Sequence, residues 1–202
     1  AAIAGMTLVL EPRVAIAIVL FPMLVLNFWQ WVSAGDLMRS ARQYFPFAGI
    51  LFVFVAITTF VSKNVAEHQL MLALGGVIIL FVAVSWSGKL PKLAAKHDLS
   101  AQIGFGIFAG IIGGMTSAWA APMGMYLNMA QVDKDEFIRA SGFMITIGSL
   151  PLCLAYAQLG FLTGPLALTS LMMIVPAMIG FGVGAAIRNR LSQVIFRHVV
   201  LV

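Results

Sequence analysis

Apolar residues form long stretches along this chain, and polar residues gather in the short connections between them. The stretches extend over residues 14–34, 44–62, 68–87, 137–158 and 162–187, and a last run begins near Gln193. Their lengths match the roughly 20 residues that a helix needs to cross the ~30 Å hydrocarbon core of a bilayer. The pattern predicts an all-α integral membrane protein, a polytopic bundle of helices.

Composition supports the membrane assignment. The chain is 61% hydrophobic and 9% charged, and its mean hydropathy is +1.02, whereas soluble domains carry about 25% charged residues. The net charge of +5 comes from Lys and Arg in the connections, as expected for orientation signals. Nucleic acid is therefore excluded as a partner.

No motif predicts catalysis, a metal site or a cofactor. The single cysteine, Cys153, excludes an internal disulfide and a Cys-rich metal site. The chain has no His-Glu-x-x-His sequence and no Walker loop, and no carboxylates cluster within an apolar run. We therefore expect no enzyme.

The polar connection at residues 88–100 separates two halves with the same layout. An offset of 125 residues pairs Gly35 with Gly160, and an offset of 130 pairs Pro46 with Pro176, which suggests a duplication. The expected units are a first membrane repeat at 1–87 without its N-terminal Gly-rich segment, a loop at 88–100, and a second repeat at 101–202 with a truncated last helix. We therefore expect a chain trimmed at both ends.

Residues 101–131 form a glycine-rich segment with a break inside it. An apolar helix is expected up to about Met115, followed by a small and polar stretch at 116–121, with Pro122 at the first position of a second helix. At ~1.5 Å per residue the two pieces span roughly 22 Å and about 15 Å, too short to cross alone. The segment is either one interrupted helix or a re-entrant hairpin.

The positive charges distinguish these two topologies. A single crossing divides Lys and Arg into five on one side and seven on the other; a hairpin leaves Arg13 and Lys63 opposite the remaining ten. Short cytoplasmic loops collect Lys and Arg, so the count favours the hairpin and places the loops at 88–100 and 131–136 on the cytoplasmic side. The hairpin also makes the two repeats inverted, as in secondary transporters with a midplane site.

The break is the candidate binding site. Non-helical backbone at membrane depth is costly unless it is buried in protein or lines a cavity. A helix that starts there directs free amides and a positive dipole end inward, which suits an anion. The hydroxyls add donors, the paired glycines allow close approach, and the tryptophan is expected at the hairpin tip. The candidate substrate-binding residues are Gly113, Gly114, Thr116, Ser117, Trp119 and Pro122.

Two further features each have two interpretations. Glycines recur four residues apart at 106, 110 and 114 and at 180 and 184, and this spacing also lets membrane helices pack tightly without any binding role. Asn27 and Gln30, one turn apart, are candidate substrate ligands if they face a cavity. They would equally serve to join helices through hydrogen bonds of about 0.6 kcal/mol.

The run from Gly104 to Pro122, followed by Asp133 to Arg139, resembles the TauE/SafE sulfite exporter family, and the likeness covers nearly the whole chain. The resemblance implies a permease that moves sulfite, organosulfonates or similar small anions across the bacterial inner membrane. Its partners would be that anion, the lipid bilayer and a coupling ion, for which the proton is the candidate. A passive small-solute channel and a structural subunit of a membrane complex are the alternatives.

Overall fold

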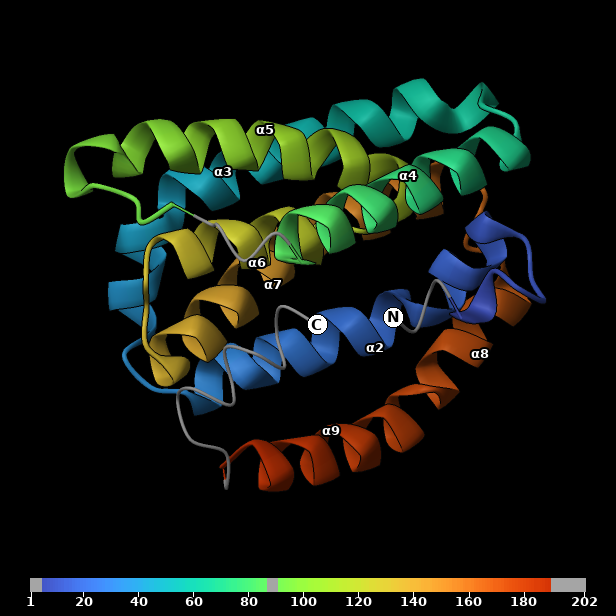
Figure 1. Cartoon of the computed structure of the whole chain (residues 1–202). Coiled ribbons are helices and arrows are strands. Elements are labelled where there is room, and N and C mark those ends of the chain that lie inside the picture. Colours follow the sequence, from blue (N-terminus) through green and yellow to red (C-terminus); the bar gives the residue numbers. More distant parts are fainter. Residues whose placement is uncertain (1–4, 87–90, 190–202) are drawn as a thin grey trace.

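The computed structural model describes residues 5–86 and 91–189, and within them the chain is a bundle of helices (Figure 1). The α-helices are α2 (Pro12–Ser33), α3 (Leu37–Val61), α4 (Glu67–Trp86), α5 (Asp98–Thr116), α6 (Ala120–Met129), α7 (Lys134–Gln158), α8 (Gly164–Met172) and α9 (Ile174–Asn189). Two 3-10 turns, η1 (Ser62–Asn64) and η2 (Ala95–His97), precede α4 and α5. Five helical segments of this part of the chain are long and apolar enough to cross a membrane. The predicted all-α membrane class is confirmed.

The stretch predicted as one helix at 162–187 is divided into α8 and α9 (Figure 1). Pro176 lies in the first turn of α9, where it has no N–H to donate and its ring clashes with the carbonyl of Met172. The two helices together still form a candidate span from Gly164 to Ile187. The last predicted helix, which starts near Gln193, lies outside the described residues.

The core lies where α3 packs against α5 on one side and α7 on the other. Its largest fully buried side chains include Tyr44, Phe47, Leu51, Tyr126 and Met144. In contrast, α4, α8 and α9 expose large apolar side chains on their outer faces, such as Leu72, Ile79, Ile179 and Val183. Exposed apolar surface of this kind suits contact with lipid.

The bundle has two ends, which we name the Arg13 end and the Asp98 end. At the Arg13 end, the Arg13 guanidinium donates to three main-chain carbonyls in and just after η1 and lies 5.0 Å from the centre of the Phe161 ring. At the Asp98 end, Asp36 in the α2–α3 turn pairs with Arg139 of α7 at 3.1 Å.

The basic residues are divided between these ends as the hairpin topology predicts. Arg13 and Lys63 lie at the Arg13 end. The Asp98 end carries the basic residues of the α3 start, the η2 region, the α7 start and the α9 end, which are Arg39, Arg42, Lys92, Lys96, Lys134, Arg139 and Arg188. Lys89, Arg190 and Arg197 lie outside the described residues.

Helices α2 and α7 run antiparallel, as an inverted repeat would require. Near the end of α2, Gln30 contacts the start of α7 at Ile138, while Arg13 at the start of α2 lies beside Phe161, which follows α7. The glycines paired by the 125-residue offset share one backbone conformation, with φ +73° at Gly35 and +74° at Gly160. The duplication itself stays a prediction.

Candidate functional site

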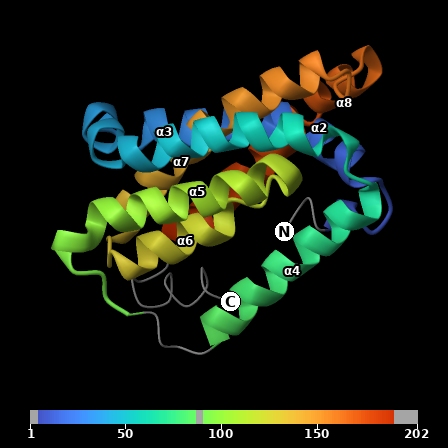
Figure 2. The same ribbon diagram turned by 90° about the horizontal axis from the view of Figure 1, so that it is seen from above.

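Helices α5 and α6 form an antiparallel hairpin, the arrangement that the hairpin interpretation of residues 101–131 predicts (Figure 2). The Tyr126 hydroxyl of α6 donates to Asp98 Oδ1 at the start of α5, at 2.9 Å. The Leu93 N–H donates to the Met129 carbonyl at the end of α6, at 2.8 Å. The chain therefore returns to the Asp98 end, where it entered.

The first arm of the hairpin is longer than the sequence indicated. Helix α5 begins at Asp98 and has 19 residues, or about 28 Å at the usual rise, and with η2 it is a candidate membrane span. The expectation that neither arm can cross alone is wrong for α5. The polar residues at 98–100 were assigned to the loop, but Asp98 occupies the first turn, where an acidic residue is stabilised by the helix dipole.

The hairpin tip lies close to the Arg13 end, away from the centre of α3. Helix α5 runs alongside α3, from the bond between Gln102 and the Gln43 carbonyl to the bond between Thr59 and the Gly114 carbonyl. Thr59 is two residues before the end of α3 at Val61. The break therefore lies within about one turn of that end.

Ser117 produces the break. It adopts a left-handed conformation with φ +53° and caps α5 through its N–H, which donates to the Gly113 carbonyl at 2.8 Å. A left-handed residue after the last turn is a common way to end a helix. Its hydroxyl donates to the Thr116 carbonyl, and the Thr116 hydroxyl donates to the Ile112 carbonyl, at 2.8 and 2.9 Å. Both predicted hydroxyl donors therefore already have main-chain acceptors.

Neighbouring groups fill the space beside Gly113 and Gly114, the two candidate glycines of α5. A Cβ at Gly113 would meet the ring of Trp119, and one at Gly114 would meet Thr58 of α3. Thr58 and Thr59 also donate to carbonyl oxygens of α5, at 3.0 and 3.1 Å. The packing interpretation therefore holds for this face. The two threonines were not among the predicted residues, although adjacent hydroxyls in an apolar run are a detectable signal.

The second arm begins with unpaired amides. Helix α6 starts at Ala120, so Pro122 is its third residue and not its first as predicted; proline is tolerated there because first-turn amides have no acceptor within the helix. Within the described residues, the N–H groups of Trp119, Ala120 and Ala121 have no hydrogen-bond acceptor. Trp119 is buried and Ala120 is exposed.

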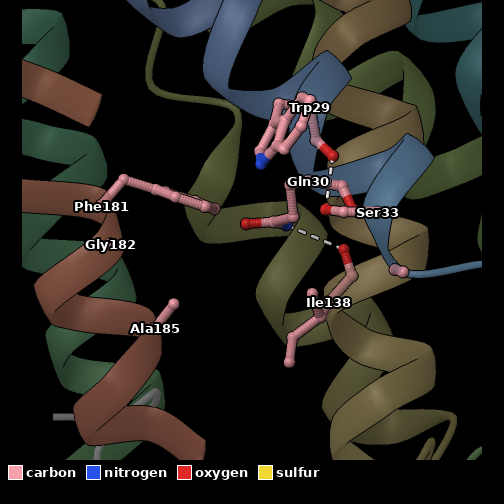
Figure 3. Close-up of a pocket in the computed structure, with 8 residues that line it drawn as sticks. Trp29, Gln30, Ser33, Ile138, Phe181, Gly182 and Ala185 are labelled. Carbon is pink, nitrogen blue, oxygen red and sulfur yellow. Dashed lines mark hydrogen bonds between the residues drawn. The ribbon is translucent and has the colours of Figure 1, made fainter. Parts of the chain in front are cut away.

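Asn27 and Gln30 lie apart from the hairpin tip, toward the Asp98 end. Gln30 borders a cavity of about 250 Å³ between α2, α7 and α9 (Figure 3). Its amide nitrogen donates to the Ile138 carbonyl at 2.8 Å and to Ser141 at 3.1 Å, which uses both N–H groups. Asn27 donates to the Met23 carbonyl at 2.7 Å. Gln30 therefore has only an acceptor left for the cavity, which does not suit an anion.

Comparison with known proteins identifies the family. The sequence model described as Sulfite exporter TauE/SafE matches residues 1–202, the whole chain. No curated protein and no solved structure matches it. The family consists of membrane transporters, in agreement with the hydropathy and the five candidate spans. The chain belongs to the TauE/SafE sulfite exporter family and is a multi-pass integral membrane protein of an anion-transporting class.

Proposed function

We propose that this protein is a permease of the bacterial inner membrane that carries sulfite or small organosulfonates. We further propose that the anion binds at the tip of the α5–α6 hairpin. The Asp98 end, where the basic residues gather, would then face the cytoplasm. The tip would face the opposite side of the membrane.

The observation that carries the proposal is the row of unpaired amides at Trp119, Ala120 and Ala121. These donors start a helix of 10 residues, whose dipole adds a partial positive charge at the same point. An oxyanion has several acceptor oxygens and can take more than one N–H at once. Hydrogen bonds to a charged group contribute ~1.5–3 kcal/mol each.

The other predicted residues of the tip would position these amides. Ser117 sets the left-handed turn before α6, and Trp119 is held against Gly113. Thr116 accepts the Ala118 N–H at 3.3 Å, while Gly114 and Pro122 are buried beside the turn. An anion held by main-chain amides is bound weakly enough to leave again, as transport requires.

Flux measurements in proteoliposomes test this function. Vesicles loaded with unlabelled sulfite should accumulate labelled sulfite above its external concentration by counterflow, and small organosulfonates should compete. A passive channel would equilibrate the label without accumulation. A structural subunit would give no flux above protein-free vesicles, and either result would contradict the proposal.

A further inference from the structure

A basic patch lies at the start of α3, at the Asp98 end and away from the hairpin tip. It borders an open cavity of about 480 Å³, and its residues are Met38, Arg39, Arg42 and Gln43. Residues three and four apart share one face of a helix, and all four side chains are exposed. The patch therefore presents two guanidinium groups together with an apolar side chain.

The two guanidinium groups have no partner within the described residues. Neither Arg39 nor Arg42 forms an ion pair or a side-chain hydrogen bond there. Asp36 is the acidic residue closest to them in the sequence, but it pairs with Arg139 at 3.1 Å. Like charges on neighbouring positions of a helix repel each other, which favours an anion that contacts both. The positive charge of the patch is thus available to a bound anion.

The position of the patch along α3 matches the headgroup layer of a bilayer. After Arg42 the rest of the helix, residues 43–61, carries no charge and spans about 28 Å at the usual rise. This length is close to the ~30 Å hydrocarbon core. With residues 43–61 in the core, Arg39 and Arg42 lie just outside it, at the level of the lipid phosphates. Arginine suits phosphate because its planar fork can donate two N–H groups at once.

An uncovered apolar face continues from the patch along α3. Positions three, seven and ten residues after Arg42 lie on its side of the helix. They are Phe45, Gly49 and Phe52. Phe45 is 67% exposed and Phe52 is 37% exposed, and a Cβ at Gly49 would meet no atom of a neighbouring described element within 4 Å. A basic patch joined to an apolar face matches a molecule with an anionic head and a hydrocarbon chain.

We propose that this patch binds the headgroup of an anionic phospholipid of the surrounding bilayer. The phosphate oxygens accept hydrogen bonds from Arg39 and Arg42, and one acyl chain lies along Phe45, Gly49 and Phe52. Clusters of basic residues at a membrane surface attract anionic lipids. A second copy of the chain is a poorer occupant, because a two-fold contact through this face would bring two pairs of unpaired arginines together. The lipid site is independent of which anion the protein transports.

Lys92 and Lys96 provide a matched control at the same end of the bundle. Lys96 lies in η2 and Lys92 just before it, and both are exposed and outside the patch. The lysine variant, Lys92→Gln/Lys96→Gln, removes two positive charges. The arginine variant, Arg39→Gln/Arg42→Gln, removes the same number from the patch. A difference between the two variants therefore reports on the patch and not on net charge.

The test is native mass spectrometry of wild-type protein and both variants in detergent, with phosphatidylglycerol or zwitterionic phosphatidylcholine added. We expect wild-type protein to bind the first phosphatidylglycerol molecule more tightly than phosphatidylcholine. The arginine variant should bind phosphatidylglycerol about tenfold more weakly or worse, because two charges near the membrane surface are lost. Its affinity for phosphatidylcholine should not change. The lysine variant should keep the wild-type preference.

Each alternative has its own result. Wild-type affinity for phosphatidylglycerol in the arginine variant would overturn the proposal, and so would an equal loss in the lysine variant, which would indicate net charge alone. Displacement of the lipid by inorganic phosphate at equal concentration would show a site for free anions instead. A dimer in the same spectra that the arginine variant loses would show a subunit interface instead. If the arginine variant does not fold, Arg42→Gln alone decides, and an unchanged lipid preference in it refutes the site.

Discussion

The glycines of α5 and those of α9 have the same spacing but different environments. A Cβ at Gly106 would lie 3.1 Å from the Phe47 carbonyl oxygen, and one at Gly110 would meet Phe54 of α3. A Cβ at Gly180 or Gly184 would have no atom of a neighbouring described element within 4 Å. Four-residue spacing therefore predicts a small, flat face, but it does not show that a neighbouring helix uses it.

Hydrogen bonds explain why α3 packs against the glycine face of α5. Close approach of the two backbones lets Thr58 and Thr59 reach the carbonyls of Gly110 and Gly114. These bonds are possible only where no side chain separates the helices. The hairpin is thus fixed along its first arm by packing and hydrogen bonds together, while the described face of α9 remains uncovered.

The largest expected effect is that of Gly114→Leu. The new side chain would meet Thr58 and would lie 2.9 Å from the Val55 carbonyl oxygen at its first atom, and a helix backbone cannot move aside cheaply. We expect loss of the monodisperse peak in fluorescence-detected size-exclusion chromatography. Gly184→Leu is the control, and equal loss in both variants would refute the distinction between the two faces.

Thr59→Val should have a smaller effect. It conserves shape but removes the hydroxyl that donates to the Gly114 carbonyl at 3.1 Å. Such bonds between membrane helices average ~0.6 kcal/mol and reach ~1.7, so the melting temperature in detergent should fall by a few degrees. Hydrogen exchange of the α5 amides near Gly114 should also increase. Unchanged exchange there would mean that packing alone holds the hairpin.

Gly148→Ala should have a still smaller effect. A Cβ at this position of α7 would lie 2.8 Å from Leu51 Cδ2, the far end of a flexible side chain that can rotate away. We expect a slight decrease in melting temperature that Leu51→Val reverses in the double variant. A loss as large as that of Gly114→Leu would show that Leu51 cannot move.

Gly180→Ala should leave stability unchanged or raise it slightly. No described atom is near the new methyl group, and alanine is preferred over glycine inside a helix by ~0.5–1 kcal/mol. Thermal unfolding in detergent is the measurement. A clear decrease would indicate that this face of α9 is covered in the assembled protein.

The sequence predicted the helical spans and the hairpin because both depend on patterns that are local or additive. Apolar length defines the spans, and the division of Lys and Arg between two sides distinguishes the hairpin from a single crossing. Arg13 and Lys63 alone are enough to show the imbalance. The division of the stretch at 162–187 into α8 and α9 was not predicted, although Pro176 explains it.

The details of the site could not be predicted, because they depend on tertiary contacts and on competing hydrogen bonds. The hydroxyls of Thr116 and Ser117 looked free in the sequence, but the end of α5 offers them carbonyl acceptors. The depth of the tip follows from the register between α5 and α3, which no sequence pattern specifies.

The most direct test of the anion site compares Ala120→Asp with Ala120→Asn. Ala120 is exposed at the first position of α6, so both side chains fit and differ in charge alone. An acidic residue is favourable at a helix start, so Asp should not harm folding. It would place a negative charge where the anion binds. Like charges ~4 Å apart repel by about 1 kcal/mol in bulk water and by about 4 kcal/mol near a protein surface.

We therefore expect Ala120→Asp to weaken the apparent affinity for sulfite in proteoliposome exchange by about tenfold or more, taking ~1.4 kcal/mol per factor of ten. Ala120→Asn should stay close to wild type. Equal, wild-type affinities in the two variants would contradict the central claim that the amides at the hairpin tip bind the transported anion.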